Sequence, residues 1–239
     1  MWHLIEALGV PSLSTYSHDI DFVWSLIFWI VGFWFVAAEL VMFWLIAKFR
    51  HKEGVPAQYI TGELKSEKKW ITWPHMAVLV FDVVIVVAAV RVWYNVKQHL
   101  PEAESTIRVI GQQWAWSFVH PGPDGKLDTA DDIPTVDELH IEVDKLYHFK
   151  LEARDVLHSF SVPVFRLKQD AIPGRVITGW FEATQTGEYD IQCAEICGVG
   201  HGIMGARIHI ETPAQHTAWI ASHSNVSVAS AAPSVAVQE

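Results

Sequence analysis

The chain has 239 residues, of which 51% are hydrophobic and 18% charged, whereas a typical soluble domain has roughly 25% charged residues. Together with twelve tryptophans, this composition indicates a membrane protein that carries a folded soluble part. The formal net charge of −10 excludes a nucleic-acid binder, which needs a basic face to meet phosphates.

Two apolar segments are predicted to cross the membrane. Residues 22–47, FVWSLIFWIVGFWFVAAELVMFWLIA, contain one charge, Glu39, and exceed the about 20 residues that a spanning helix needs. Residues 74–96, PHMAVLVFDVVIVVAAVRVWYNV, are Val-rich and contain Asp82; we place Pro74 in the first helical turn. Charges within spans are expected to face protein partners. A pair of buried core helices is the alternative, and segment length favours the membrane.

Basic residues predict the orientation of this hairpin. Loop 48–73 holds six Lys and Arg residues, whereas residues 1–21 hold none. The positive-inside rule therefore places the loop in the cytoplasm and both termini outside, in a bacterial-type plasma membrane or an equivalent inner membrane. Residues 98–239 hold nine basic and nineteen acidic side chains, so the net negative charge lies outside. The N-terminus lacks the basic start of a secretory signal, although removal of a signal by processing stays open.

The residues after Pro101 form a predicted all-β domain. Short segments with alternating apolar residues are separated by turn clusters such as HPGPDGK and TQTGE, a pattern typical of a sandwich or barrel. AQHTAWIASH is predicted to be a short helix, followed by a small, polar tail. The predicted organisation is an external segment 1–21, a transmembrane hairpin 22–97, a β-domain 98–213, and a helix with a partly disordered tail 214–239.

Both cysteines of the chain lie in QCAEICGVGHGIM, residues 192–204. A Cys193–Cys197 disulfide suits an external domain, but it would close a loop of only three intervening residues, where the stabilisation is smallest. Zinc sites usually use CxxC pairs, and methionine is a poor zinc ligand. Thiolates, imidazole and a thioether together favour copper in electron-transfer sites. A second imidazole is then needed, and His158 in ARDVLHSFSVP, between two apparent strands, is the candidate.

The sequence resembles subunit II of the haem–copper cytochrome c oxidases. DVLHSFSVP, LKQDAIPGR and QCAEICGVGHGIM stand in the family's order and at its spacing, and the resemblance extends from residue 20 to residue 212. It implies a membrane-anchored all-β fold: two N-terminal transmembrane helices, then a cupredoxin-like β-barrel domain on the outer side. The CxxxCxxxHxxM motif with an upstream DVLHS is highly specific to this family.

The resemblance also implies a dinuclear copper A centre. Two thiolates shared by two metals delocalise one unpaired electron, so little geometry changes on reduction. The implied ligands are two bridging thiolates, one imidazole for each copper, a weak thioether and a backbone carbonyl, supplied by Cys193, Cys197, His158, His201, Met204 and Glu195.

Further roles follow from the resemblance. The Glu195 side chain would help to hold a magnesium ion at the contact with subunit I, and Asp170 would lie near the same interface. Trp114 in GQQWAWSF would be the exposed residue where electrons from cytochrome c, or another cytochrome donor, arrive; Ala115 replaces the aromatic residue common in the family. Glu67 matches a carboxylate at the entrance of a proton path, a solvated surface glutamate being the alternative.

The acidic outer domain suits attraction of a basic cytochrome c. Asp155 and Glu152 are the docking candidates. Residues 120–133 depart from the family as an insertion, in which a calcium ion is the bolder interpretation and a solvated acidic hairpin the plainer one. The calcium ligands at 124–132 would be Asp124, Asp128, Asp131 and Asp132.

The leading hypothesis is the electron-transferring subunit of a respiratory, proton-translocating oxidase. With subunit I and other oxidase subunits, it would pass electrons from cytochrome c through copper A to haem, where oxygen is reduced to water; the chain alone would only transfer electrons. The first alternative is a copper A subunit of a nitric oxide or nitrous oxide reductase type complex, against which the two spans and LKQDAIPG weigh. A quinol-oxidase subunit would lack ligands that are present here, and a tethered copper chaperone would not need Trp114.

Overall fold

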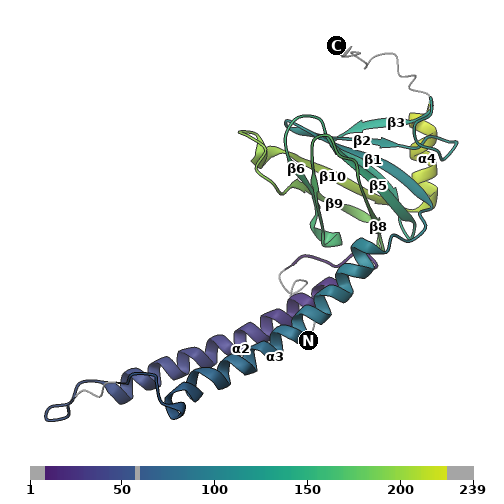
Figure 1. Ribbon diagram of the computed structural model, residues 1–239. Helices are drawn as coiled ribbons and strands as arrows, with labels where there is room; N and C mark the ends of the chain where they lie inside the picture. Colours follow the sequence, from purple (N-terminus) through teal and green to yellow (C-terminus); the bar gives the residue numbers. More distant parts are fainter. Residues whose placement is uncertain (1–8, 57–59, 225–239) are drawn as a thin grey trace. The chain divides into compact units, whose positions relative to one another are not determined.

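The computed structural model describes residues 9–56 and 60–224 (Figure 1). The predicted external residues 1–8 and the predicted disordered tail 225–239 lie outside the described residues. The described chain divides into two compact units. Residues 19–98 form a helical unit, and residues 9–18 join residues 99–224 in a β unit.

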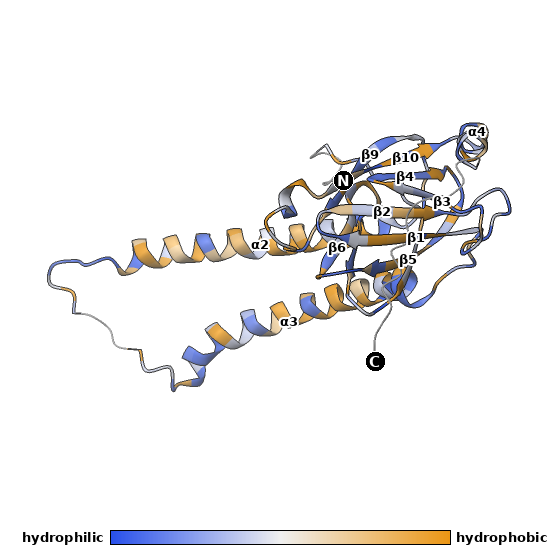
Figure 2. Ribbon diagram, turned by 90° about the horizontal axis from the view of Figure 1, so that it is seen from above, coloured by the Kyte–Doolittle hydropathy of each residue, from blue (hydrophilic) through white to orange (hydrophobic). Residues whose placement is uncertain are grey.

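The helical unit holds two long apolar helices, α2 (Ser17–Phe49) and α3 (Lys65–Trp93), the latter continued by the π-helical turn η1 (Tyr94–Gln98). Both are long and apolar enough to cross a membrane, with mean hydropathies of 2.2 and 2.4 over their most apolar stretches. Apolar residues cover both helices (Figure 2), and most of these side chains are exposed. Such surfaces suit lipid rather than water, in agreement with the two predicted spans.

Helix α3 begins at Lys65, so Pro74 lies inside the helix and the prediction that it occupies the first turn is wrong. Glu67 explains the earlier start. Its Oε2 accepts hydrogen bonds from the backbone N–H groups of Gly62 (3.0 Å) and Leu64 (3.4 Å). A carboxylate in the first turn satisfies free N–H groups and complements the helix dipole, which stabilises a helix start before the apolar segment.

The β unit is built from two five-stranded sheets. The first has the order β3-β2-β1-β5-β8 and the second β4-β10-β9-β6-β7; β1–β5 and β10–β4 are parallel pairs and the other pairs are antiparallel. The all-β prediction is therefore confirmed. The strands are β1 (Ser105–Gln112), β2 (Ala115–His120), β3 (Ile133–Val136), β4 (Glu138–Glu142), β5 (Leu146–Ala153), β6 (His158–Val162), β7 (Leu167–Ala171), β8 (Ile177–Glu182), β9 (Gly187–Cys193) and β10 (Gly205–Glu211).

An aromatic cluster joins the two sheets. Phe160 of β6 contacts the rings of Trp116, Phe118 and Phe149 from the first sheet, at centroid distances of 5.5, 6.3 and 5.8 Å. All four side chains are fully buried. His158 begins this same strand and is not between strands, which corrects its predicted position. The aromatic core therefore fixes the strand that carries one of the predicted metal ligands.

The N-terminal segment 9–18 packs on the β unit, a contact that the sequence did not predict. The backbone N–H of Leu13 donates to the Val164 carbonyl (2.8 Å), and Thr184 N–H donates to the Leu13 carbonyl (2.9 Å). Leu13 is itself buried. This segment covers the neighbourhood of β8, the edge strand of the first sheet, whose exposed backbone would otherwise invite pairing with another chain.

Tyr16→Phe should lower the free energy of unfolding of the β unit by about 1 kcal/mol, the net contribution of one buried hydrogen bond. The Tyr16 hydroxyl donates to the Trp180 carbonyl (3.3 Å), and its ring packs edge-on against the Trp180 indole. Thermal unfolding of the detergent-solubilised full chain measures the effect. Thr15→Val, which removes an exposed hydroxyl from the same segment, is the matched control and should leave the transition unchanged. Equal shifts in both variants would contradict this account.

A histidine cluster lies beneath the C-terminal helix α4 (Pro213–His223). The two oxygens of Glu211 accept hydrogen bonds from the Nδ1 atoms of His140 (2.8 Å) and His216 (2.9 Å). Trp219 of α4 stacks on His140 with a centroid distance of 4.3 Å. The Nε2 atom of the buried His120 accepts a hydrogen bond from the backbone N–H of His140 (3.0 Å). These hydrogen bonds and the stacked rings thus attach α4 to the second sheet.

Acidification should destabilise the β unit through His120. Burial lowers the pKa of this imidazole from 6.5 to about 3, so the unfolded chain binds a proton that the folded chain rejects. The contribution of His120 to stability is complete above pH 6.5 and is lost as the pH falls toward 3. At about 1.4 kcal/mol per pH unit, the loss reaches about 2 kcal/mol at pH 5.

Chemical denaturation of the full chain at several pH values checks this effect. His120→Gln keeps a donor and an acceptor but does not titrate, so its stability should vary less with pH. His99→Gln removes an exposed imidazole and should behave like the unmodified chain. An unchanged pH dependence in His120→Gln would refute the assignment.

Candidate metal centre

Strand pairing brings together the predicted metal ligands of the β unit. Strands β6 and β9 pair with Phe160 opposite Cys193, so that His158 at the start of β6 lies beside the end of β9. The other ligands lie between β9 and β10, where a 3-10 turn, η3 (His201–Ile203), ends just before Met204. Backbone hydrogen bonds from Cys193 N to the Met204 carbonyl (3.1 Å) and from His201 N to the Gly198 carbonyl (3.1 Å) hold this loop.

The sulfur and nitrogen atoms converge around the two cysteines. Both thiols are free, and their Sγ atoms lie 3.7 Å apart. His158 Nδ1 is 4.0 Å from Cys193 Sγ, and His201 Nδ1 is 3.7 Å from Cys197 Sγ, so each thiol has its own imidazole. Met204 Sδ lies 3.8 Å from Cys197 Sγ. Among the described ranges, the ligand atoms of His158, Cys193 and Cys197 form the one metal-binding group found, all within 4.8 Å of one another.

A backbone carbonyl completes the set of donor atoms, and the sulfur donors are buried. The Glu195 carbonyl oxygen lies 3.3 Å from Cys193 Sγ, and the Glu195 side chain is half-buried. Cys193, Cys197 and Met204 are buried. Two thiols and a thioether are soft donors, and imidazole also suits copper, so these residues together with the carbonyl fit a copper pair.

Burial, together with the neighbouring Cys193 thiol, raises the pKa of the Cys197 thiol to about 11. In the metal-free protein this thiol is therefore protonated at neutral pH. Since metals bind the thiolate, metal uptake must release protons and becomes weaker as the pH falls.

Asp155 orients His158. Its Oδ1 lies 2.8 Å from His158 Nε2, which leaves Nδ1 of the fully buried ring facing the thiols. Carboxylates commonly fix metal-binding histidines in this way and raise their basicity. Burial raises the pKa of Asp155, but hydrogen bonds from His158 and from the Gln113 and Val156 N–H groups outweigh it, so the pKa lies below the usual range. Asp155 was predicted only as a docking residue. Its contact with His158 was not predicted, although its position three residues before His158 was a usable signal.

The Trp114 indole lies directly against the loop 194–204 between β9 and β10, which is called the ligand loop below. Its Nε1–H donates to the Cys197 carbonyl (3.3 Å), and the side chain is 38% exposed. A Cβ at Gly200 would collide with the indole ring, so glycine at this position admits the contact. Trp116, by contrast, is fully buried, with its ring edge-on to His158 at a centroid distance of 6.1 Å. The structure thus separates the two tryptophans: one reaches the surface beside the cysteines and the other belongs to the core.

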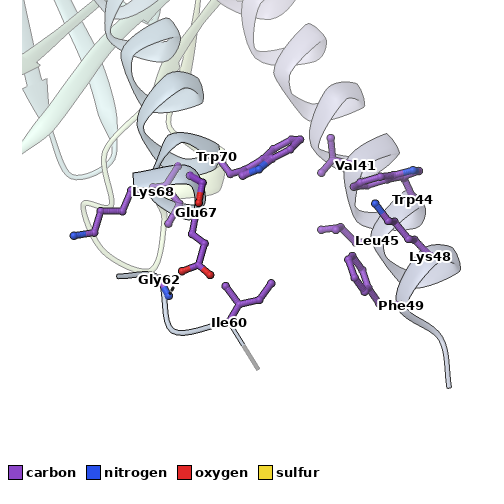
Figure 3. A pocket seen from close by; sticks show the side chains of 12 residues that line it. Val41, Trp44, Leu45, Lys48, Phe49, Ile60, Gly62, Glu67, Lys68 and Trp70 are labelled. Atoms are coloured by element: carbon purple, nitrogen blue, oxygen red, sulfur yellow. Dashed lines mark hydrogen bonds between the residues drawn. The ribbon is translucent and has the colours of Figure 1, made fainter. Parts of the chain in front are cut away.

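Other predicted residues lie elsewhere. Glu67 belongs to the helical unit, where it lines a groove of about 520 Å³ between α2 and α3 with Trp44, Lys48 and Trp70 (Figure 3). Asp170 of β7 lies 3.7 Å from Lys168 Nζ, and Glu152 Oε1 lies 3.3 Å from Arg108 Nε.

The acidic insertion uses its carboxylates within its own loop. Asp131 Oδ2 accepts from the Asp124 N–H (3.2 Å), and Asp132 Oδ2 accepts from the Asp128 N–H (2.9 Å). Asp128 also pairs with Arg108. These contacts suit the solvated acidic hairpin that the sequence offered as the alternative, and calcium binding here stays a prediction.

An all-β domain with thiols and imidazoles gathered at one sheet end, joined to two apolar helices, defines a membrane-anchored cupredoxin-like protein. Residues 105–212 match the family model described as cytochrome c oxidase subunit II, periplasmic domain. The alternative cytochrome c oxidase subunit 2 of Bradyrhizobium diazoefficiens is 32% identical over 242 residues, covering 92% of this chain and 86% of the relative. The chain therefore belongs to the cytochrome c oxidase subunit II family, which confirms the resemblance.

Two further similarities were found. Cytochrome c oxidase subunit 2 of Cereibacter sphaeroides is 28% identical over 241 residues, covering 88% of this chain and 78% of the relative. The crystal structure of the periplasmic domain of subunit II of cytochrome oxidase of Bradyrhizobium japonicum matches with a TM-score of 0.47 and 28% identity, over 52% of this chain and 96% of that chain.

Proposed function

We propose that the chain accepts electrons from cytochrome c at a dinuclear copper A centre and passes them to haem in subunit I of a respiratory haem–copper oxidase, where oxygen is reduced. As a member of its family, the chain is a subunit of an oxidoreductase complex. The observation that carries the proposal is the pair of free thiols 3.7 Å apart, each with its own imidazole. The pairing of each thiol with its own imidazole would suit two metal ions better than one.

The ligand roles in this proposal follow the donor atoms. A bound copper pair would supply a carrier of one electron. The chain's own contribution is to hold the ligand atoms in place in both oxidation states, by strand pairing on one side and loop hydrogen bonds on the other. The residues that would hold the pair are Cys193, Cys197, His158, His201, Met204 and the Glu195 carbonyl.

Electrons would arrive at Trp114, which combines surface exposure with a hydrogen bond to a ligand residue. Ile196, Val199 and Ile203, all in the ligand loop, are 75%, 96% and 84% exposed. Large exposed apolar side chains mark interaction sites, and here they offer cytochrome c an apolar contact area. The negative charge of the outer residues would steer a basic donor toward it, with an association rate that falls as salt rises.

The membrane arrangement is proposed on charge. Two apolar helices anchor the chain, and the β unit matches a periplasmic domain model. The six basic residues of loop 48–73 support a cytoplasmic position for that loop and an external position for both termini. In this arrangement residues 22–97 would form the transmembrane hairpin with its cytoplasmic loop, and residues 98–213 would form the copper domain.

Two carboxylates have proposed roles at subunit I. The half-buried Glu195 side chain would help to bind magnesium. The resemblance gives it this role, and its position in the ligand loop would hold the carboxylate near the copper pair. Glu67, with one carboxylate oxygen held by the Gly62 and Leu64 N–H groups, would lie at the entrance of a proton path.

Purification through a tag on this chain tests the proposed function. A haem-bearing subunit should co-purify, and the complex should consume oxygen when it is given reduced cytochrome c. A complex that carries the copper pair but reduces nitric oxide or nitrous oxide instead of oxygen would contradict the oxidase assignment.

A further inference from the structure

A chain of hydrogen bonds connects the β1–β2 turn with two of the proposed ligand residues, His158 and Cys197. Asp155 accepts from His158 at Oδ1 (2.8 Å) and from the Gln113 backbone N–H at Oδ2 (2.7 Å). On the other side of the turn, the Gln113 side-chain amide donates from Nε2 to the Cys197 carbonyl (2.8 Å). Gln113 is therefore bonded to one ligand residue directly and to another through a single carboxylate.

The contact between Gln113 and the loop is built into the backbone. Gly198 follows Cys197 with a φ of +123°, a conformation that residues with a side chain rarely adopt. A Cβ at Gly198 would lie 3.0 Å from Gln113 Nε2 and 3.1 Å from the Trp114 ring. The glycine thus leaves the space in which both side chains reach the same carbonyl, and the amide makes the shorter of the two hydrogen bonds.

We propose that Gln113 is a positioning residue for the copper centre, which sets its electron affinity through the Cys197 carbonyl and keeps Trp114 against the ligand loop. This inference rests on the proposed function. It gives a role to a residue that lies outside QCAEICGVGHGIM and is not one of the proposed ligands. Gln113 itself contacts neither a metal-binding sulfur nor a metal-binding nitrogen in the contacts described; it acts through the backbone of Cys197 and through Asp155.

The Gln113 amide, as a hydrogen-bond donor, determines whether the electron affinity of the centre rises or falls. The amide N–H group points its positive end at the carbonyl of a thiolate ligand, and hydrogen bonds around metal ligands tune redox potential. This dipole stabilises the more electron-rich, reduced state of the centre. Removing the donor should therefore favour the oxidised state and make electron transfer from cytochrome c less favourable.

The test uses the purified complex with the full chain and compares three variants. Gln113→Leu removes the donor at similar size, and Gln113→Lys keeps a donor of similar reach. Gln112→Leu is the matched control, because this neighbouring glutamine accepts from Arg154 (2.8 Å) and not from the ligand loop. The readouts are copper content, the electron spin resonance spectrum, and the equilibrium constant for electron sharing between cytochrome c and the centre in anaerobic titrations.

Gln113→Leu should lower that equilibrium constant about five-fold, the size expected for one lost hydrogen bond, and should alter the spin resonance spectrum. Gln112→Leu should match the unmodified complex, and Gln113→Lys should give a value equal to or above it. An unchanged constant in Gln113→Leu, or an equal fall in Gln113→Lys, would overturn the inference.

If Gln113→Leu loses copper, retention of copper in Gln113→Lys still supports the donor role, whereas loss in both overturns it. An unmodified complex without a copper pair would instead contradict the proposed function itself.

Discussion

Cys197→Ser should abolish the copper centre and lower cytochrome c oxidation by the complex by more than about 100-fold. Loss of a residue that merely supports a ligand costs 10- to 100-fold in affinity or activity, and the loss of a bridging ligand should exceed that. Cys197 Sγ lies within 4 Å of three other candidate ligand atoms, those of Cys193, His201 and Met204. A serine hydroxyl is a harder donor and does not replace a thiolate shared between two copper ions.

Copper content and the visible spectrum of the purified complex measure this effect. Val199→Ser is the matched control, because it places the same side chain in the same loop at a position that is 96% exposed. This control should bind copper normally. Full copper content and an unchanged spectrum in Cys197→Ser would show that the ligand assignment is wrong.

Trp114→Ala should leave copper bound and yet slow the oxidation of cytochrome c. We expect kcat/KM to fall about 30-fold, which corresponds to the loss of about 2 kcal/mol when a tryptophan is the anchor of an interface. The indole is exposed to a partner on one side and touches Gly200 and the Cys197 carbonyl on the other. No comparable contact with the cysteines is available from Trp116, which is buried in the core.

Two comparisons separate the role of Trp114 from a general loss of structure. Reduction of the variant by a small-molecule reductant should remain fast, because such a reagent does not need the docking surface. Trp219→Ala removes an indole that packs on His120 and His140, and it should affect stability but not kcat/KM. A Trp114→Ala complex that oxidises cytochrome c at the normal rate would place electron arrival elsewhere.

The parts of the centre that could be predicted are those encoded within short motifs. QCAEICGVGHGIM carries five of the six proposed ligand groups, and the resemblance supplied His158 from DVLHSFSVP. Strand pairing between β6 and β9 then explains why a histidine 35 positions upstream of Cys193 lies beside it. The two apolar helices could also be predicted from local sequence, because an apolar stretch of 18 or more residues is typical of a membrane-spanning helix.

What the sequence did not predict depends on tertiary contacts. Leu13 pairs with Val164, and His216 meets His140 through Glu211, across separations that no local pattern encodes. Gln113 was not singled out from the sequence, because its amide meets the Cys197 carbonyl only in the folded protein. The error at Pro74 has a local cause: a proline suits a first turn, but the Glu67 carboxylate stabilises an earlier helix start at Lys65.

Copper quantitation together with electron spin resonance of the purified complex decides whether this chain holds a copper pair. We expect two copper ions in this chain and a spectrum in which one unpaired electron is shared equally by both nuclei. A single copper, a zinc ion, or a Cys193–Cys197 disulfide in the mature protein would contradict it.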